Sequence, residues 1–186
     1  MATEKLKFKL ELYATMWDKP PIADIKINKL DNKTTTDTDN KNYFDKDSNK
    51  PILAIDPSYF NDEITSTKDK PTIIEFEHEL EEGKSYSLII DRLGKDISQC
   101  KLKDGKIIKD QLLHIKSIEI DDIDIGGLVY EGVYKPDYPK LWATQQIKAG
   151  NKLPETLKNV TKMGHNGTWT FTFSSPFYIW LLENLY

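Results

Sequence analysis

The stretch Gln111–Tyr134, QLLHIKSIEIDDIDIGGLVYEGVY, carries the pattern on which the fold prediction rests. Apolar and polar residues alternate through its first half, which is the spacing of a β-strand. The apolar positions change phase between Ile115 and Ile118. A one-residue insertion in a strand produces such a change, so a β-bulge is predicted near Lys116 and Ser117.

An acidic turn joins this strand to a second predicted strand, residues 128–134. The turn contains Asp121, Asp122 and Asp124. Neighbouring carboxylates repel one another unless a cation or water screens them. Calcium takes six to eight oxygen ligands, many of them carboxylates, so these three residues are a candidate calcium site. The alternative is a solvated turn, because aspartate and glycine are residues that turns favour.

Strand patterns on both sides of this stretch predict an all-β fold. Residues 5–14 and 22–28 alternate cleanly, and residues 72–90 predict a hairpin. Residues 168–173 predict a further strand, and the apolar residues after Pro176 predict a short C-terminal helix. Many short strands with turn-rich connections indicate an antiparallel β-sandwich, jelly-roll-like, with that helix at its end.

The bulk composition suits one domain, residues 1–186, with material for a sizeable core. The net charge of −4 gives no support for nucleic-acid binding. The first residues alternate between charged and apolar side chains, so we expect no signal peptide. No apolar run approaches the length of a membrane span, so no membrane insertion is expected. The compartment is left open.

Four aromatic residues fall in proline- or glycine-rich connections and are candidate ligand contacts. They are Trp17, Tyr134, Tyr138 and Trp142. A flat ring held by a stiff loop can stack on a sugar ring. The alternative is that these rings close the open end of the sandwich, whereas the strand residue Trp169 is predicted to lie in the core.

The sequence contains none of the local motifs that mark common catalytic sites. There is no GxSxG nucleophile motif, no HExxH zinc motif and no phosphate-binding glycine loop. The chain is therefore predicted not to be an enzyme.

Four segments resemble β-sandwich domains encoded by marine bacteriophages. They are DQLLHIKSIEIDDIDI (110–125), YEGVYKPDYP (130–139), GHNGTW (164–169) and PFYIWLLENL (176–185). Those domains look like calcium-dependent carbohydrate-binding modules of the xylan-binding type. The resemblance implies a non-catalytic module in which a bound calcium ion coordinates sugar hydroxyls.

Together these observations predict a calcium-assisted carbohydrate-binding module for a polysaccharide or cell-surface glycan. The alternative is a phage virion structural or protein-interaction domain without glycan affinity, made in the host cytoplasm and contacting virion neighbours. One geometric condition applies to the first hypothesis. A single strand separates the acidic turn from Trp142, which predicts opposite ends of the sandwich unless the 135–142 loop folds back.

Overall fold

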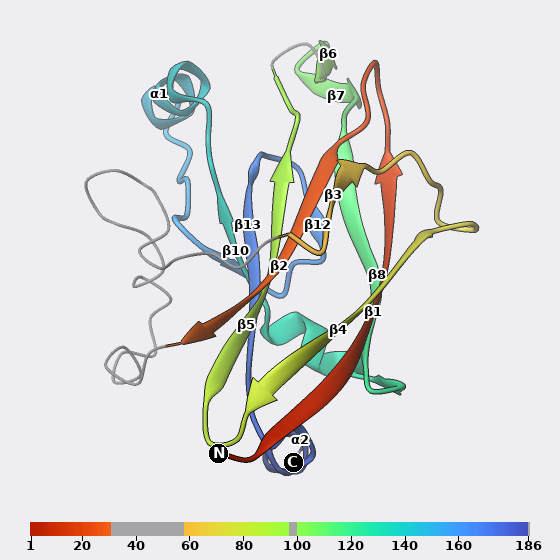
Figure 1. Ribbon diagram of the computed structural model, residues 1–186. Helices are drawn as coiled ribbons and strands as arrows, with labels where there is room; N and C mark the ends of the chain where they lie inside the picture. The colour runs from red at the N-terminus through yellow and green to blue at the C-terminus, as the bar shows by residue number, and fades with distance from the viewer. Residues whose placement is uncertain (31–57, 97–99, 186) are drawn as a thin grey trace.

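The computed structural model describes residues 1–30, 58–96 and 100–185, which form two antiparallel sheets packed face to face (Figure 1). The first sheet has the order β12-β8-β1-β4, with β9 paired to β8. Its strands are β1 (Thr3–Thr15), β4 (Thr72–Glu81), β8 (Leu112–Ile120), β9 (Ile123–Asp124) and β12 (Lys162–Met163). The predicted all-β sandwich with a short C-terminal helix is confirmed.

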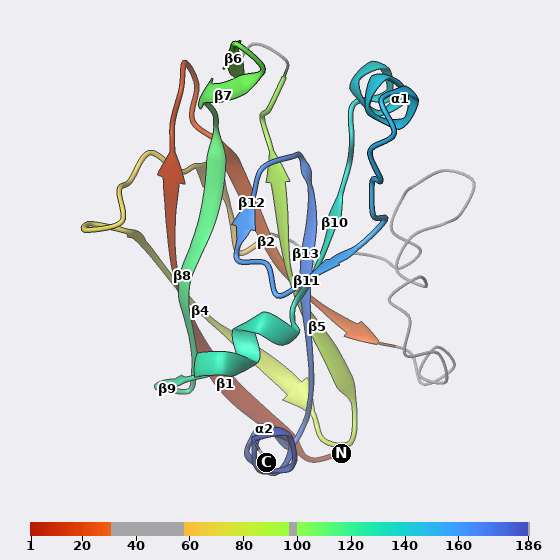
Figure 2. The ribbon, with the colours of Figure 1, turned by 180° about the vertical axis from the view of Figure 1, so that it is seen from behind.

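The second sheet has the order β11-β10-β13-β5-β2-β3. Its strands are β2 (Ile22–Leu30), β3 (Phe60–Glu63), β5 (Ser85–Leu93), β10 (Val133–Pro136), β11 (Leu157–Lys158) and β13 (Gly167–Ser174). A separate hairpin, β6 (Lys101–Lys103) and β7 (Lys106–Lys109), projects from one end of the sandwich, as does the helix α1 (Lys140–Lys148). The 3₁₀ helix η3 (Gly126–Glu131) and the helix α2 (Phe177–Asn184) lie toward the other end (Figure 2).

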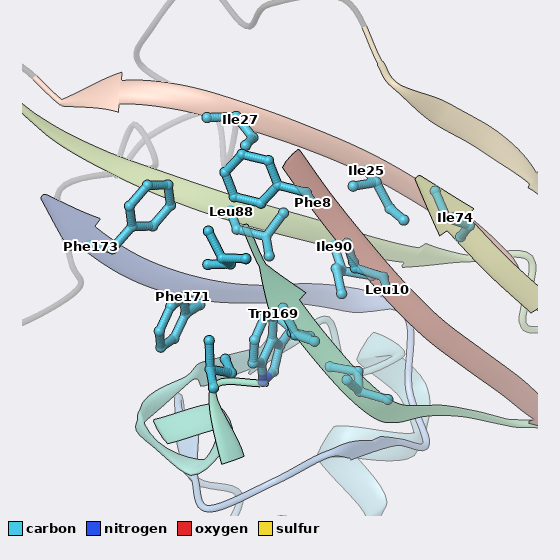
Figure 3. Close-up of a cluster of buried hydrophobic side chains, with 14 of the residues drawn as sticks. Phe8, Leu10, Ile25, Ile27, Ile74, Leu88, Ile90, Trp169, Phe171 and Phe173 are labelled. Carbon is cyan, nitrogen blue, oxygen red and sulfur yellow. The ribbon is translucent and has the colours of Figure 1, made fainter. Parts of the chain in front are cut away.

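Alternate residues of the central strands fill the space between the sheets (Figure 3). They include Phe8, Leu10, Ile25, Ile27, Ile74, Leu88, Ile90, Trp169, Phe171 and Phe173. Trp169 is fully buried and its indole N–H donates to the carbonyl of Val160. Burial of a large ring with its polar atom satisfied is strongly stabilising, and it confirms the core role predicted for this residue.

The predicted hairpin over residues 72–90 is wrong. Strand β4 pairs with β1, whereas β5 pairs with β2 and β13 in the other sheet. The turn at Gly83, with φ of 76°, therefore carries the chain from one sheet to the other. Alternation could not reveal this, because both strands present an apolar face to the same core.

The bulge predicted in β8 is confirmed. Against β1, Ser117 pairs with Glu11 and Ile115 pairs with Leu12, which leaves Lys116 as the extra, exposed residue. The insertion lets the apolar residues on both sides of it face the core.

The segment after the acidic turn differs from the prediction. Residues 128–131 belong to η3, and a strand begins only at Val133. Helix α1 was also not predicted, because its nine residues include none that is buried and so give no amphipathic signal.

The C-terminal helix α2 is held by residues far away in the sequence. A carboxylate oxygen of Glu4 accepts a hydrogen bond from the backbone N–H of Phe177 at 2.8 Å. This contact satisfies one of the free N–H groups that every helix start exposes. Ser175, two residues before the helix, makes no side-chain cap bond. Among the described residues, no helix has the length and apolarity needed to cross a membrane.

Candidate functional site

The acidic turn is a tight two-residue hairpin turn. Ile120 pairs with Ile123, and Asp121 and Asp122 between them have φ of 54° and 63°. Two consecutive positive φ values define a type I′ turn, and aspartate tolerates this conformation better than most residues. The sequence therefore places acidic residues here for a conformational reason.

Two of the three carboxylates of this turn, those of Asp121 and Asp124, accept hydrogen bonds from the protein itself. The hydroxyl of Tyr178 donates to Asp121 at 2.5 Å, and the N–H of Gly126 donates to Asp124 at 2.7 Å. Within the described residues, no group of three or more His, Cys, Asp or Glu side chains is arranged to hold a metal ion. Calcium needs several convergent oxygens, so Asp121, Asp122 and Asp124 do not fit a calcium ion.

The acidic turn and the loop aromatics lie at opposite ends of the sandwich. The turn contacts α2, which lies at the end where both termini are drawn, while α1, which carries Trp142, lies at the other end (Figures 1 and 2). These residues therefore cannot share one site, as the single intervening strand had suggested.

Three rings form a cluster at the α1 end, here called the aromatic cluster: Tyr138, Trp142 and His165. Tyr138 and Trp142 are stacked, with centroids 5.8 Å apart and planes 25° apart. The His165 ring packs against both, with its centroid 5.1 Å from that of Tyr138 and 4.8 Å from that of Trp142. Two rings stacked directly face to face would have their centroids only about 3.5–4 Å apart, which is the contact distance of their atoms. The two larger rings are therefore offset, and all three side chains are partly exposed.

The aromatic cluster is held by local structure. Tyr138 follows β10, and Trp142 lies in the first turn of α1 after Pro139, whose carbonyl accepts from Ala143 at 2.8 Å. The Tyr138 hydroxyl donates to the carbonyl of Pro154 at 2.9 Å. The Tyr138 ring is therefore anchored both by β10 and by its hydroxyl bond, and Trp142 is positioned by the first turn of α1.

The exposure predicted for Tyr134 is wrong. Its side chain is only 2% exposed, and its hydroxyl bonds to the backbone of His165. Burial raises the pKa of the Tyr134 hydroxyl to about 12. Tyr134 supports the loop that carries His165, but it cannot offer a ring face to a ligand.

Trp17 lies in the β1–β2 connection at the same end of the sandwich as the aromatic cluster. The ammonium group of Lys109 lies 3.7 Å from the centre of its ring, and that of Lys101 lies 6.0 Å away. A cation over an indole face is a favourable contact. Trp17 thus supports the β6–β7 hairpin, and Lys109 occupies part of the face that a sugar would need.

A buried polar network supports the loop before β13. Arg92 is fully buried, and its guanidinium donates to Asn166 at 2.7 Å and to the side chain of Gln111 at 2.6 Å. The Asn166 side chain in turn bonds to the backbone N–H and carbonyl of Lys95, at 3.0 and 2.9 Å. Burial lowers the pKa of Arg92 to about 10, so the group stays charged at neutral pH.

Two contributors to this site were missed by the sequence reasoning. His165 lies in a short turn between Gly164 and Gly167, a pattern that does not indicate a binding role, but its ring packs on Tyr138 and Trp142. Arg92 follows Leu88 and Ile90 in the same alternation, so its strand position already indicated an inward-facing charge. A buried arginine requires acceptors, which the chain supplies from Gln111 and Asn166.

Acidification should destabilise the protein through two histidines. Burial lowers the pKa of His165, with Lys95 adding repulsion, and burial likewise lowers the pKa of His114. Below pH about 6.5 these two histidines bind protons in the unfolded chain but remain neutral in the folded chain until the pH reaches their lowered pKa values. The contribution of the two histidines to the free energy of unfolding should therefore be fully present above that pH. It should be lost as the pH drops toward their pKa values in the folded protein.

Urea unfolding at several pH values between neutral and mildly acidic conditions measures this dependence. His165→Phe keeps a ring in the aromatic cluster and cannot titrate, so it should flatten the pH dependence. An unchanged dependence in both His165→Phe and His114→Gln would contradict the assignment.

Comparisons of the chain with known protein families, with curated proteins and with solved structures found no match.

Proposed function

We propose that the protein is a non-catalytic carbohydrate-binding module whose contact surface is the aromatic cluster. The observation that carries this proposal is the offset, partly exposed pair of rings formed by Tyr138 and Trp142. The ligand would be a polysaccharide or a cell-surface glycan. Sugar rings present flat C–H faces, and rigid aromatic surfaces bind such faces at low cost in conformational entropy.

The surroundings of the aromatic cluster favour a preformed site. The Tyr138 hydroxyl is already bonded to Pro154, and Asp137 donates its backbone N–H to Asn166 at 2.6 Å. A ring that is fixed before binding loses little freedom when a sugar stacks on it. Trp142 should contribute most to the affinity, because it is the larger of the two rings and offers more stacking surface.

Calcium assistance, which the phage resemblance implies, receives no support at the acidic turn. The turn lies at the opposite end of the sandwich, and its Asp121 and Asp124 carboxylates accept hydrogen bonds from Tyr178 and Gly126. The proposal therefore takes stacking by Tyr138 and Trp142 as sufficient. Glycan binding that disappears in EGTA would show that a cation holds ligands elsewhere.

Trp142→Ala should weaken glycan binding at least about tenfold, because buried aromatic anchors dominate binding energy at interfaces. A glycan array identifies the ligand, and titration calorimetry then measures the affinity of the wild type and the variant. Tyr130→Ala is the matched control, since Tyr130 is 49% exposed but lies in η3 toward the other end.

Equal affinities for Trp142→Ala and the wild type would contradict the proposed contact surface. Absence of binding to every glycan tested would contradict the function itself.

A second candidate function, a protein-interaction domain of the kind found in virions, is favoured by one observation. Helix α2 exposes an apolar face formed by Tyr178, Ile179, Leu182 and the following Leu185. Leu182 is 63% exposed. An apolar stripe at helical spacing on a surface is typical of docking faces. The dye ANS binds such surfaces, so Ile179→Ser/Leu182→Ser should lower its fluorescence.

A further inference from the structure

The β6–β7 hairpin carries an unusual concentration of positive charge for an acidic protein. Residues 101–109, KLKDGKIIK, contain four lysines and one aspartate in a chain of net charge −4. Lys101 pairs across the strands with Lys109, and Lys103 pairs with Lys106. Like charges directly opposite each other are destabilising in a hairpin. Within the described residues, no carboxylate forms an ion pair with any of these lysines.

The same hairpin exposes large aliphatic side chains. Leu102 and Ile107 form a cross-strand pair, each 61% exposed, and Ile108 is exposed beside them. We call this surface, residues 101–109, the basic hairpin. It combines cations that no carboxylate of the described residues neutralises with an uncovered apolar pair, so its complement is a surface that is both acidic and apolar.

The α2 end of the same molecule provides such a surface. The outward residues of α2 are apolar, and the acidic turn adjoins them because Tyr178 donates to Asp121. Asp122, Asp124 and Glu183 are exposed there. Neither residues 121–124 nor residues 177–185 contain a basic residue. We call this surface the acidic helix face.

The structure points to a head-to-tail contact in which the basic hairpin of one copy docks on the acidic helix face of another. We propose this partner, a second copy of this chain, because the two surfaces match in charge and in apolar character. Hairpin-to-hairpin contact would bring eight lysines together, twice the four of one copy, and helix-to-helix contact would oppose carboxylates. The proposal rests on the second candidate function and supplies its partner.

The geometry of the two surfaces determines what such a contact builds. They lie at opposite ends of the sandwich (Figures 1 and 2). A contact between two different surfaces leaves one of each free, so copies add in sequence to form a ring or an open filament. Both surfaces are small, and contacts below about 1,200 Å² are generally weak. We therefore expect association in the micromolar range or weaker, reduced by salt.

Two apolar variants separate the two halves of the contact. Leu102→Ser/Ile107→Ser removes the apolar pair of the hairpin, and Ile179→Ser/Leu182→Ser removes that of the helix. All four side chains are largely exposed, so both variants should fold, which circular dichroism checks. Light scattering after size-exclusion chromatography, across a range of concentrations, should show growing mass for the wild type and monomers for each variant.

The decisive measurement is an equimolar mixture of the two variants. Each retains one intact surface, so the mixture should form a complex that stops at one copy of each. The double variant Lys103→Glu/Lys106→Glu should also show no increase of mass with concentration. Added salt should weaken the self-association of the wild type by about tenfold or more. Growth in either single variant, or no pairing in the mixture, would overturn the proposal.

Other occupants give distinct results. Binding of the wild type to vesicles of anionic lipid, lost only in the hairpin variant, would assign the hairpin to a membrane surface and overturn self-docking. A wild type that remains monomeric would also overturn it. If the helix face of that monomer still binds ANS and the α2 variant does not, the second candidate function survives with another partner.

Discussion

Replacing Arg92 with methionine should lower the free energy of unfolding by about 3 kcal/mol. The guanidinium is fully buried and donates to Asn166 and to both the side chain and the carbonyl of Gln111. Hydrogen bonds to a charged group contribute about 1.5–3 kcal/mol each, and the variant leaves buried acceptors unpaired. Opposing this is the cost of burying the charge, which the lowered pKa of Arg92, about 10, records. Three bonds outweigh that cost.

Urea unfolding followed by tryptophan fluorescence measures the effect. Lys103→Met is the matched control, because it makes the same class of change at an exposed site and should stay within about 0.5 kcal/mol of the wild type. A loss below about 1 kcal/mol for Arg92→Met would show that relief of the buried charge cancels the lost bonds.

Gly167→Ala should also cost about 3 kcal/mol or more. Gly167 begins β13 and pairs with Pro136 at the end of β10. An added Cβ atom would lie 2.3 Å from the carbonyl oxygen of Lys135 and 2.8 Å from the Cα atom of Pro136. Both contacts are with backbone, so β10 must move away from β13. Because Tyr138 follows β10 directly, the aromatic cluster should move as well.

Thermal unfolding and glycan titration of the same variant test the two consequences separately. Gly127→Ala is the matched control, since its added Cβ atom would meet no neighbour within 4 Å. Wild-type stability in Gly167→Ala would mean that the β10–β13 pair can separate without cost. Wild-type glycan affinity in a destabilised variant would mean that the aromatic cluster does not depend on β10.

Alternation predicted most strands because one face of each is buried and the other is wet. Strand β1 shows this: Leu6, Phe8, Leu10 and Leu12 are all buried. The same argument could not assign partners. Alternation determines which face of β4 is buried but not which sheet β4 joins, so the turn at Gly83 was interpreted as a hairpin.

Burial of the site residues was predictable only where they continue a strand pattern. Tyr134 belongs to β10, a strand of four residues, too short for a reliable period. Helix α1 has no buried residue, so its sequence contains no apolar face to detect. His165 is brought to Tyr138 and Trp142 by long-range pairing of β10 with β13, which no local pattern encodes.

The positions of the first and last strands determine when the chain can fold during synthesis. Strand β1 lies inside one sheet, between β8 and β4, and β13 lies inside the other, between β10 and β5. The first sheet can pair β1 with β4 and β8 once residue 120 has been made, but the second sheet lacks its inner strand β13 until residues 167–174 have left the ribosome. The protein should therefore fold late and in one cooperative step, with slow kinetics typical of distant strand pairing. Nascent chains that lack β13 should remain sensitive to protease.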